Sequence, residues 1–335
     1  MSQFCFVVLS YNGIEYIPEL LESIARQTYD NIHTIIVDNG STDGTTEYVR
    51  RRGDSGLMLI ENGENFGCAA GYNIGARHAA ADADFICFLN QDVVLCDDFA
   101  EIMVERLTQS PNCGALQPLV RFMSDPSLVE NCGHTADLWF SCETLGHGSS
   151  EVPAISGNFM FTLTAPVVRK LLFQQLEGFD EDLFIYYEDT DLSFRILLAN
   201  FSIGFEPRAI AYHHQAASAG KKTNAWHIFL YTRNRIRLLW KYADSCAGYA
   251  RLVTFCGASL MLAAVLSVRR PAESLAMARA FAWHLLNHRS NIAAKRTLRR
   301  RASRSTNAVF RSIVSSQGGL LELLRRGTAL FRHAP

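Results

Sequence analysis

Four short apolar runs within the first ninety residues, each followed by polar side chains, constrain the fold of this chain most strongly. They span residues 4–9, 34–37, 57–60 and 85–89. Segments with helical periodicity separate them, and the first begins at Pro18, with Leu20, Leu21 and Ile24 at helical spacing. Strands that alternate with helices of this length form right-handed βαβ units. The sequence therefore predicts an α/β fold with a mostly parallel sheet flanked by helices.

The polar residues at the ends of these runs predict a ligand site. Asn12, Asp38 and Asn65 follow the first three runs, and Asn90 and Asp92 follow the fourth. Because the carboxyl ends of parallel strands meet at one edge of a sheet, we expect these side chains to lie close together. An amide and a carboxylate two residues apart face the same side of an extended chain, so Asn90 and Asp92 can share one bound ion. Each turn alone is also consistent with an ordinary polar turn.

A second acidic segment lies further along the chain. Glu188, Asp189 and Asp191 follow large apolar residues and begin a helical pattern. Three carboxylates at this spacing repel one another, so the cluster requires a cation, a helix N-terminus or a role in proton transfer. An acidic helix cap, worth roughly 0.3–1 kcal/mol, is the simpler interpretation. Taken alone, the segment leaves both interpretations open.

Six segments occur in a fixed order within residues 4–243. They are Val-Leu-Ser-Tyr-Asn (8–12), Val-Asp-Asn-Gly-Ser-Thr-Asp-Gly (37–44), the Asn- and Gly-rich stretch 65–75, Leu-Asn-Gln-Asp (89–92), the block 178–191 and Arg-Asn (233–234). This ordered set resembles the inverting family 2 glycosyltransferases, and within them a bacterial branch that includes rhamnosyltransferases. The resemblance implies a GT-A catalytic domain over residues 1–245, followed by a helical, basic, membrane-associating region over residues 246–335.

The resemblance also implies roles for individual residues. Asp189 would be the catalytic base, while Glu188 and Asp191 would bind the acceptor, although Asp191 could also cap its helix. Asp38 would accept a hydrogen bond from the nucleotide base, with an Asx turn as the alternative. Gly71 would let the backbone approach the ligand. The complete set implied for the donor nucleotide is Ser10, Asn12, Asp38, Asn65, Gly71, Asn73 and Asn90.

A metal site follows from the same resemblance. Asp92 and His213 would hold Mg²⁺ or Mn²⁺, which bridges the diphosphate of the donor and stabilises the leaving nucleotide. His213 precedes Ser218 by five residues, as the family pattern requires, although adjacent histidines such as His213 and His214 often only fill space. Many family members carry Asp at the position of Asn90, so the neutral amide is a departure that weakens the expected ribose contact and charge balance.

Cysteine content and the N-terminus indicate the compartment. The nine cysteines are odd in number and lack paired short spacings, which favours reduced thiols in the cytosol over a disulfide framework or a zinc site. Residues 4–9 are short, lack a basic leader and are needed as the first strand, so we expect no signal peptide.

Charge is distributed unevenly along the chain. Residues 269–335 carry a net charge of +12, whereas residues 1–268 carry −13. Between these parts, residues 252–268 lack charge, and their length is at the lower limit of about 17–25 residues for a membrane span. We expect this segment to lie on a membrane, with the arginine-rich residues 295–301 facing an anionic surface. A solvated basic helix is the alternative, and the absence of interleaved aromatic residues argues against nucleic acid.

Together these features predict an enzyme that is cytoplasmic and peripheral on the inner face of the cell membrane. It would move a sugar from a nucleoside-diphosphate sugar to a hydroxyl of a glycan or lipid-linked acceptor during polysaccharide synthesis. The resemblance suggests rhamnose, and hence dTDP-rhamnose as donor. Nucleotidyl transfer would leave the Glu188-Asp189 pair unexplained. The alternative from a different class is an inactive sugar-nucleotide-binding or scaffold protein docked at a membrane, which only Asn90 favours.

Overall fold

The computed structural model describes residues 2–155, 157–215 and 225–313. It contains two compact units. The sheet unit comprises Met1–His134 and Thr144–Ala217, and the helical unit comprises Thr135–Glu143 and Ser218–Pro335. The boundary after residue 245 that the sequence suggests stays a prediction.

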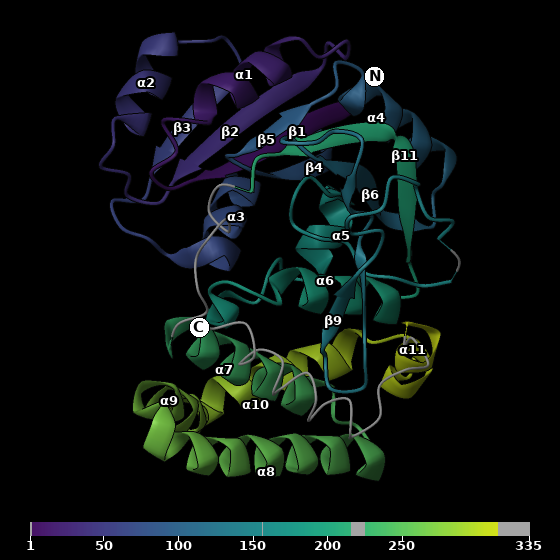
Figure 1. Cartoon of the computed structure of the whole chain (residues 1–335). Helices are drawn as coiled ribbons and strands as arrows, with labels where there is room; N and C mark the ends of the chain where they lie inside the picture. The colour runs from purple at the N-terminus through teal and green to yellow at the C-terminus, as the bar shows by residue number, and fades with distance from the viewer. Residues whose placement is uncertain (1, 156, 216–224, 314–335) are drawn as a thin grey trace. The chain divides into compact units, whose positions relative to one another are not determined.

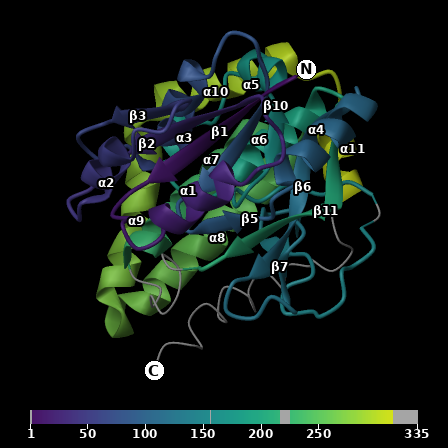
Figure 2. The same cartoon turned by 90° about the horizontal axis from the view of Figure 1, so that it is seen from above.

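A nine-stranded mixed sheet forms the centre of the sheet unit (Figure 1). Its strands run in the order β3-β2-β1-β4-β10-β6-β11-β5, and β7 pairs with β6. Figure 2 shows this order from β3 at one edge toward β6, β11 and β7 at the other. The bounds are β1 Gln3–Ser10, β2 Ile32–Asp38, β3 Leu57–Glu61, β4 Ala83–Asn90, β5 Val93–Leu95, β6 Cys113–Phe122, β7 Val129–Asn131, β10 Val167–Arg169 and β11 Ser202–His213. The four predicted strands are confirmed as β1 to β4, and they pair in parallel.

The rest of the sheet contains one further parallel pair and three short antiparallel strands. Strand β11 is parallel to β6, whereas β10, β5 and β7 pair antiparallel with their neighbours. The predicted mostly parallel sheet is therefore a mixed sheet in which short antiparallel strands join the longer parallel ones.

Helices cover both faces of the sheet, and the period-two alternation of the strands explains how. Phe4, Phe6 and Val8 of β1 belong to a buried cluster that includes apolar side chains of α1 and α4. The intervening side chains of β1, including Val7 and Leu9, face α3 on the other side. The helices of this unit are α1 Ile17–Ala25, α2 Thr45–Arg52, α3 Gly67–His78, α4 Phe99–Gln109, α5 Lys170–Gln175, η1 Glu181–Leu183 and α6 Glu188–Leu198.

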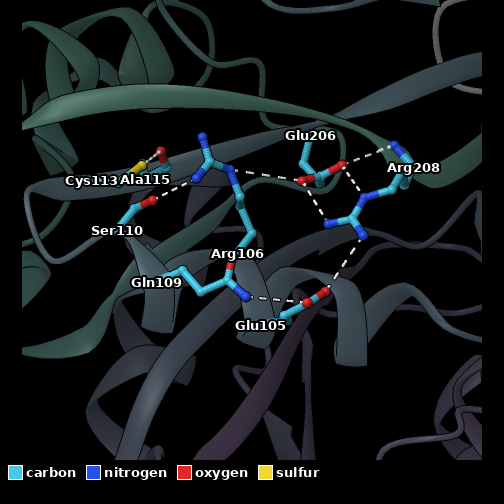
Figure 3. A network of polar contacts seen from close by, with 8 residues as sticks. All are labelled: Glu105, Arg106, Gln109, Ser110, Cys113, Ala115, Glu206 and Arg208. Carbon is cyan, nitrogen blue, oxygen red and sulfur yellow. Dashed lines mark hydrogen bonds and ion pairs between the residues drawn. The ribbon is translucent and has the colours of Figure 1, made fainter.

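A polar network holds an irregularity in β11 against α4 (Figure 3). The register of β11 against β6 shifts between Glu206 and Ile210. Arg208 turns back to donate to both carboxylate oxygens of Glu206, at 2.9 and 3.2 Å, and lies 3.5 Å from Glu105. Although burial acts in the opposite direction, these hydrogen bonds keep the pKa of Glu206 below its ordinary value. Beyond the shift, β11 pairs His213 with Val93 of β5, which brings the end of the strand to the loop that holds Asp92.

The helical unit contains α7 Ala225–Tyr242, α8 Cys246–Arg269, α9 Pro271–Leu286, α10 His288–Arg301 and α11 Thr306–Ile313. The segment 135–143 joins this unit, and it carries most of the two-stranded sheet of β8 His134–Ala136 and β9 Cys142–Thr144. Phe140 packs against Tyr242 and Phe310, with ring centroids 5.7 and 5.1 Å apart. Within the described residues, α8 is the one helix long and apolar enough to cross a membrane, which by itself is weak evidence.

Candidate active site

The ends of β1 and β2 place Ser10 beside Asp38 in register. Asp38 is 2% exposed and accepts hydrogen bonds from the backbone N–H of Gly40 (3.0 Å) and Ser41 (2.8 Å) and from the Ser41 hydroxyl. This is the Asx turn that the sequence left as an alternative. Asp38 therefore builds the turn at the strand end, and its contact with a nucleotide base stays a prediction.

Loops that follow β1, β2 and β4 are joined by side chains from the predicted donor set. Ser10 donates its hydroxyl to Gln91 Oε1 at 3.0 Å. Asn12, with a φ of 50°, donates its backbone N–H to Ser41 Oγ and accepts from the Thr42 N–H, both at 2.8 Å. These bonds bring the strand ends together on one rim of the sheet, as the sequence predicts.

The Asn- and Gly-rich segment forms the turn into α3. Asn65 accepts a hydrogen bond from the Gly67 N–H at 2.9 Å, which shapes this turn. Gly67 has a φ of +83°, and an added Cβ would lie 2.5 Å from the Phe184 ring, so a side chain is excluded there. The close approach is between two protein loops, the α3 turn and the loop before α6.

Two members of the predicted donor set have contacts other than those expected. An added Cβ at Gly71 would lie 2.3 Å from Leu9 Cδ1, so this glycine lets α3 pack on β1, and its approach to a ligand stays a prediction. Asn73 is 6% exposed, donates to the Phe179 carbonyl (2.9 Å) and to Glu181 (3.0 Å), and accepts from the Phe179 N–H (2.8 Å). Its amide thus joins α3 to the segment before η1, and its contact with the donor stays a prediction.

The predicted metal residues lie side by side. His213 Nε2 is 3.2 Å from Asp92 Oδ1, and its Nδ1 is 2.9 Å from both carboxylate oxygens of Glu130 on β7. Burial acts against protonation, but the hydrogen bonds to Asp92 and Glu130 raise the pKa of His213 to about 9. Sequence reasoning missed Glu130, whose only signal was an acidic residue next to the apolar Val129. Ser218, the partner expected from the family spacing, lies outside the described residues.

This arrangement fits a divalent cation. Asp92 Oδ1 and His213 Nε2 are an oxygen and a nitrogen only 3.2 Å apart, and Glu130 fixes the opposite ring nitrogen, as second-layer carboxylates do for metal-bound histidines. The described part of the chain contains no group of three His, Cys, Asp or Glu side chains that could hold an ion alone. Mg²⁺ commonly takes only one or two protein ligands and completes its shell with phosphate and water oxygens. Asn90 lies nearby in sequence, and its Oδ1 accepts from the Tyr72 hydroxyl at 2.9 Å.

The acidic segment before α6 is held in an unusual backbone conformation. Phe184, Tyr186 and Tyr187 have φ values of 63°, 73° and 72°, in the region that non-glycine residues rarely adopt. The Phe184 carbonyl accepts from the backbone N–H of Cys68 (2.5 Å) and Ala69 (3.1 Å), at the start of α3. Such outliers persist where surrounding contacts enforce them, which is typical of functional sites.

Glu188 and Asp191 differ in environment, although both are buried. Glu188 is 5% exposed, and its Oε2 has no hydrogen-bond partner among the residues that the structure describes. Burial, followed by the charge of Asp189, raises the pKa of Glu188 to about 8. Asp191 is fully buried and accepts from Arg195 Nε at 2.8 Å, and Arg195 also donates to the Leu176 carbonyl at 2.7 Å. These contacts are those of a buried ion pair, and the expected acceptor contact of Asp191 stays a prediction.

Asp189 is partly exposed at the start of α6. Its Oδ1 accepts from the backbone N–H of Thr190 at 2.6 Å and from the Thr190 hydroxyl at 3.2 Å. No hydrogen bond reaches Oδ2 from any residue within the described ranges. One carboxylate oxygen is therefore fixed by its neighbour, and the other is available to a ligand.

Helix α3 contacts the segments that lead to both acidic groups. Tyr72 is fully buried, and burial raises the pKa of its hydroxyl well above the ordinary value. This hydroxyl donates to Asn90 at the end of β4, two residues before Asp92. The first residues of α3 donate to the Phe184 carbonyl, four residues before Glu188. The same helix thus contacts two segments that are about a hundred positions apart in sequence.

A mixed sheet with flanking helices and acidic residues at the strand ends is the architecture of the GT-A fold. Comparison with solved structures agrees: a mannosyltransferase from Pyrobaculum calidifontis, solved with GDP-Man and Mn²⁺, matches with a TM-score of 0.53 and 20% identity. The match covers 92% of this chain and 86% of that one. At this identity the likeness establishes the fold.

Sequence comparison shows which family the chain resembles. Residues 5–140 match the model of glycosyl transferase family 2. The N-acetylglucosaminyl-diphospho-decaprenol L-rhamnosyltransferase of Mycobacterium tuberculosis is 27% identical over 243 residues, which cover 64% of this chain and 77% of that protein. The O-antigen chain rhamnosyltransferase RfbN of Salmonella typhimurium is 22% identical over 221 residues, which cover 62% of this chain and 65% of that protein. The chain is therefore similar to glycosyltransferase family 2 over residues 5–140, and the relatives it resembles include rhamnosyltransferases.

Proposed function

We propose that the protein transfers a sugar from a nucleoside diphosphate to a hydroxyl of a glycan or lipid-linked glycan, with inversion at the sugar carbon. The observation that carries this proposal is that α3 contacts two segments of the sheet unit. One is the strand end that precedes Asp92, which lies beside His213, and the other is the loop that precedes Glu188 and Asp189. A transferase of this kind requires one group to stabilise the departing diphosphate and another to take the proton of the attacking hydroxyl. The two clusters supply one group each.

Asp189 is proposed as the base. Its unbonded Oδ2 takes the proton of the acceptor hydroxyl while the acceptor oxygen forms a bond to the sugar carbon. The bond from that carbon to the phosphate oxygen breaks on the opposite face, and its electron pair stays with the nucleoside diphosphate. Glu188, with its unpartnered Oε2, is proposed to bind the acceptor.

Asp92 and His213 are proposed to hold Mg²⁺ or Mn²⁺ together with the diphosphate. When bound, the ion neutralises the charge that develops on the leaving group. The side chains of Ser10, Asn12, Asp38, Asn65 and Asn90 are proposed to contact the nucleotide, since they lie along the strand ends or in the turns that follow them.

Rhamnose is the sugar that we propose as the donated group. The names of the mycobacterial and Salmonella relatives both specify rhamnosyl transfer. The test is a screen of nucleotide sugars with the purified full-length chain, Mn²⁺ or Mg²⁺ and polyprenol-linked acceptors, beginning with dTDP-rhamnose. Transfer from another sugar nucleotide would replace rhamnose but retain the reaction. Absence of transfer or hydrolysis with every donor, despite donor binding, would favour the scaffold alternative.

We further propose that the helical unit binds the cytoplasmic face of an anionic membrane. Exposed apolar side chains of α8 recur on one helical face, namely Val253, Leu260, Met261, Val265 and Val268. The opposite face, which includes Phe255, Ser259, Ala263 and Leu266, is buried, and α8 packs against α7 and α9. Burial along one side suits a helix that lies in the interface more than one surrounded by lipid. The arginine-rich end of α10 supplies charge, at about 1 kcal/mol for each basic residue near an anionic surface.

Vesicle co-sedimentation tests the membrane proposal. Met261→Glu with Val265→Glu places two charges on side chains that are 73% and 72% exposed, and should weaken binding to anionic vesicles. The matched control is Leu171→Glu, a 70% exposed leucine on α5 of the sheet unit, which should bind as the wild type does. Equal binding by all variants, or no preference for anionic lipid, would refute the assignment of this surface.

A further inference from the structure

A chain of hydrogen bonds runs from a buried histidine to Asp189. His134 Nε2 lies 3.0 Å from Thr190 Oγ1, and Thr190 Oγ1 lies 3.2 Å from Asp189 Oδ1. All three residues belong to the sheet unit. His134 is 4% exposed, and neither the motifs nor the proposed function assigns it a role.

The backbone around His134 fixes the position of its ring. His134 and Met160 exchange both backbone hydrogen bonds, each at 2.8 Å. The preceding Gly133 has a φ of +99°, and an added Cβ would lie 2.7 Å from the Met160 carbonyl oxygen. A side chain at position 133 is therefore excluded, and the turn holds the backbone of His134 where its imidazole contacts Thr190.

The direction of the hydrogen bonds follows from the chemistry of the three groups. An ionised carboxylate only accepts, so the Thr190 hydroxyl donates its single proton to Asp189. The Thr190 oxygen must then accept from His134, which requires the tautomer with a proton on Nε2. Burial keeps the pKa of His134 below its ordinary value, against the opposing charge of Asp189, so the ring is neutral and carries one proton.

We propose that His134 and Thr190 are positioning residues for the base, which hold Asp189 Oδ1 so that Oδ2 faces the acceptor hydroxyl. Two donors from Thr190, the backbone N–H at 2.6 Å and the hydroxyl at 3.2 Å, fix Oδ1, and His134 fixes the hydroxyl. A carboxylate that can rotate presents its free oxygen to the acceptor for only part of the time, and small errors in position cost up to about 10²-fold in rate. The proposal rests on the assignment of Asp189 as the base.

The proton transfer uses only Oδ2 of Asp189, so Oδ1 can stay hydrogen-bonded to Thr190. The acceptor O–H bond breaks and its proton passes to Oδ2, while the acceptor oxygen bonds to the sugar carbon. The protonated carboxyl then carries its hydrogen on the oxygen that faces solvent and substrate, where it can be lost. The hydrogen bonds at Oδ1 remain unchanged throughout, so no rearrangement inside the protein accompanies transfer.

Four substitutions in the full-length protein test the proposal. Thr190→Val removes the hydroxyl with little change in shape, and Thr190→Ser keeps it. His134→Phe removes the ring donor, and His134→Gln places an amide N–H near the position of Nε2. We expect kcat to fall about 10- to 100-fold in the Val and Phe variants, with little change in the KM of donor or acceptor. The Ser and Gln variants should recover most of this loss.

A double-mutant cycle distinguishes positioning from general destabilisation. If both residues act through the same hydrogen bond, His134→Phe combined with Thr190→Val should lose no more kcat than Thr190→Val alone. His284→Phe is a matched control, because His284 is a partly buried histidine of the helical unit whose Nε2 bonds the Arg233 carbonyl. That variant can lower the melting temperature but should not lower kcat selectively.

Three results would overturn the proposal. They are unchanged kcat in folded His134→Phe, multiplicative losses in the double variant, or a Gln variant as slow as the Phe variant. Failure of the proposed function would give a different result. If Asp189 were not the base, Asp189→Asn would transfer sugar normally. If only the positioning were wrong, Asp189→Asn would be inactive while the His134 and Thr190 variants stayed fully active.

Discussion

The buried pair Asp191–Arg195 allows the role of one predicted acceptor residue to be tested against structure. The Asp191 side chain is 0% exposed and that of Arg195 is 9% exposed, with 2.8 Å between the charged groups. Removal of one partner from such a pair leaves a buried charge without compensation, which costs about 3–5 kcal/mol. We expect Asp191→Asn to lose about 3 kcal/mol, since the amide can still accept from Arg195.

The melting temperature gives the measurement. For a cooperative unit of this size, each kcal/mol corresponds to about 2–4 °C, so the expected decrease is about 6–12 °C. The matched control is the double variant Asp191→Leu with Arg195→Met, because it removes both charges. It also leaves the Leu176 carbonyl without its hydrogen-bond donor. That loss costs about 1 kcal/mol, so the double variant should be more stable than Asp191→Asn.

Steady-state kinetics completes the test. If Asp191 only stabilises α6, the acceptor KM of Asp191→Asn at a temperature where it is folded should equal that of the wild type. An unchanged melting temperature with a raised acceptor KM would refute this reasoning and restore Asp191 to the acceptor site.

The remaining predictions concern the reaction and its pH dependence. Asp189→Asn should reduce transfer by about 10²–10⁴-fold while donor binding persists, and near-normal kcat would exclude Asp189 as the base. Chelation should stop turnover until Mn²⁺ or Mg²⁺ is restored, and Asp92→Asn should weaken Mn²⁺ binding measured directly by calorimetry; full activity in excess chelator would contradict the metal assignment. The raised pKa of Glu188, about 8, predicts that its contribution to stability is present below its unfolded-state pKa and is lost as pH rises toward 8. The free energy of unfolding, measured from denaturation curves, should therefore fall less with rising pH in Glu188→Gln than in the wild type. The same pH dependence in both proteins would disprove the raised pKa of Glu188.

Local sequence patterns were sufficient to predict the framework of the sheet unit. Residues 4–9 and 85–89 are short apolar runs bounded by polar turns, and both are central parallel strands in the structure. The antiparallel strands β5, β7 and β10 contain only three residues each, too few for a period-two pattern to be recognised. Their pairing depends on distant segments, as when β10 inserts between β4 and β6.

The sequence indicates candidate site residues where chemistry and position coincide, as at Asp92 and at Glu188-Asp189, and their roles stay predictions. It gives no signal where a residue acts through a partner far along the chain. Glu130 meets His213 across 83 positions, and His134 meets Thr190 across 56, so neither has a local signal. Asn73 and Gly71 have residue types that suit a ligand loop, and the structure shows that they also have packing roles, against Phe179 and Leu9, that the sequence did not indicate.

The same geometry explains why the segment 65–75 and the block before α6 have to occur together. The Phe184 carbonyl binds two backbone N–H groups at the start of α3, and Gly67 is excluded from carrying a side chain by the Phe184 ring. Positive φ values cost of order 1–3 kcal/mol each for non-glycine residues, so the loop that carries Phe184, Tyr186 and Tyr187 needs such support to persist. The segment predicted to bind the donor thus supports the backbone that presents Asp189. Changes at Gly67 should accordingly affect the placement of the proposed base as well as the shape of the donor loop.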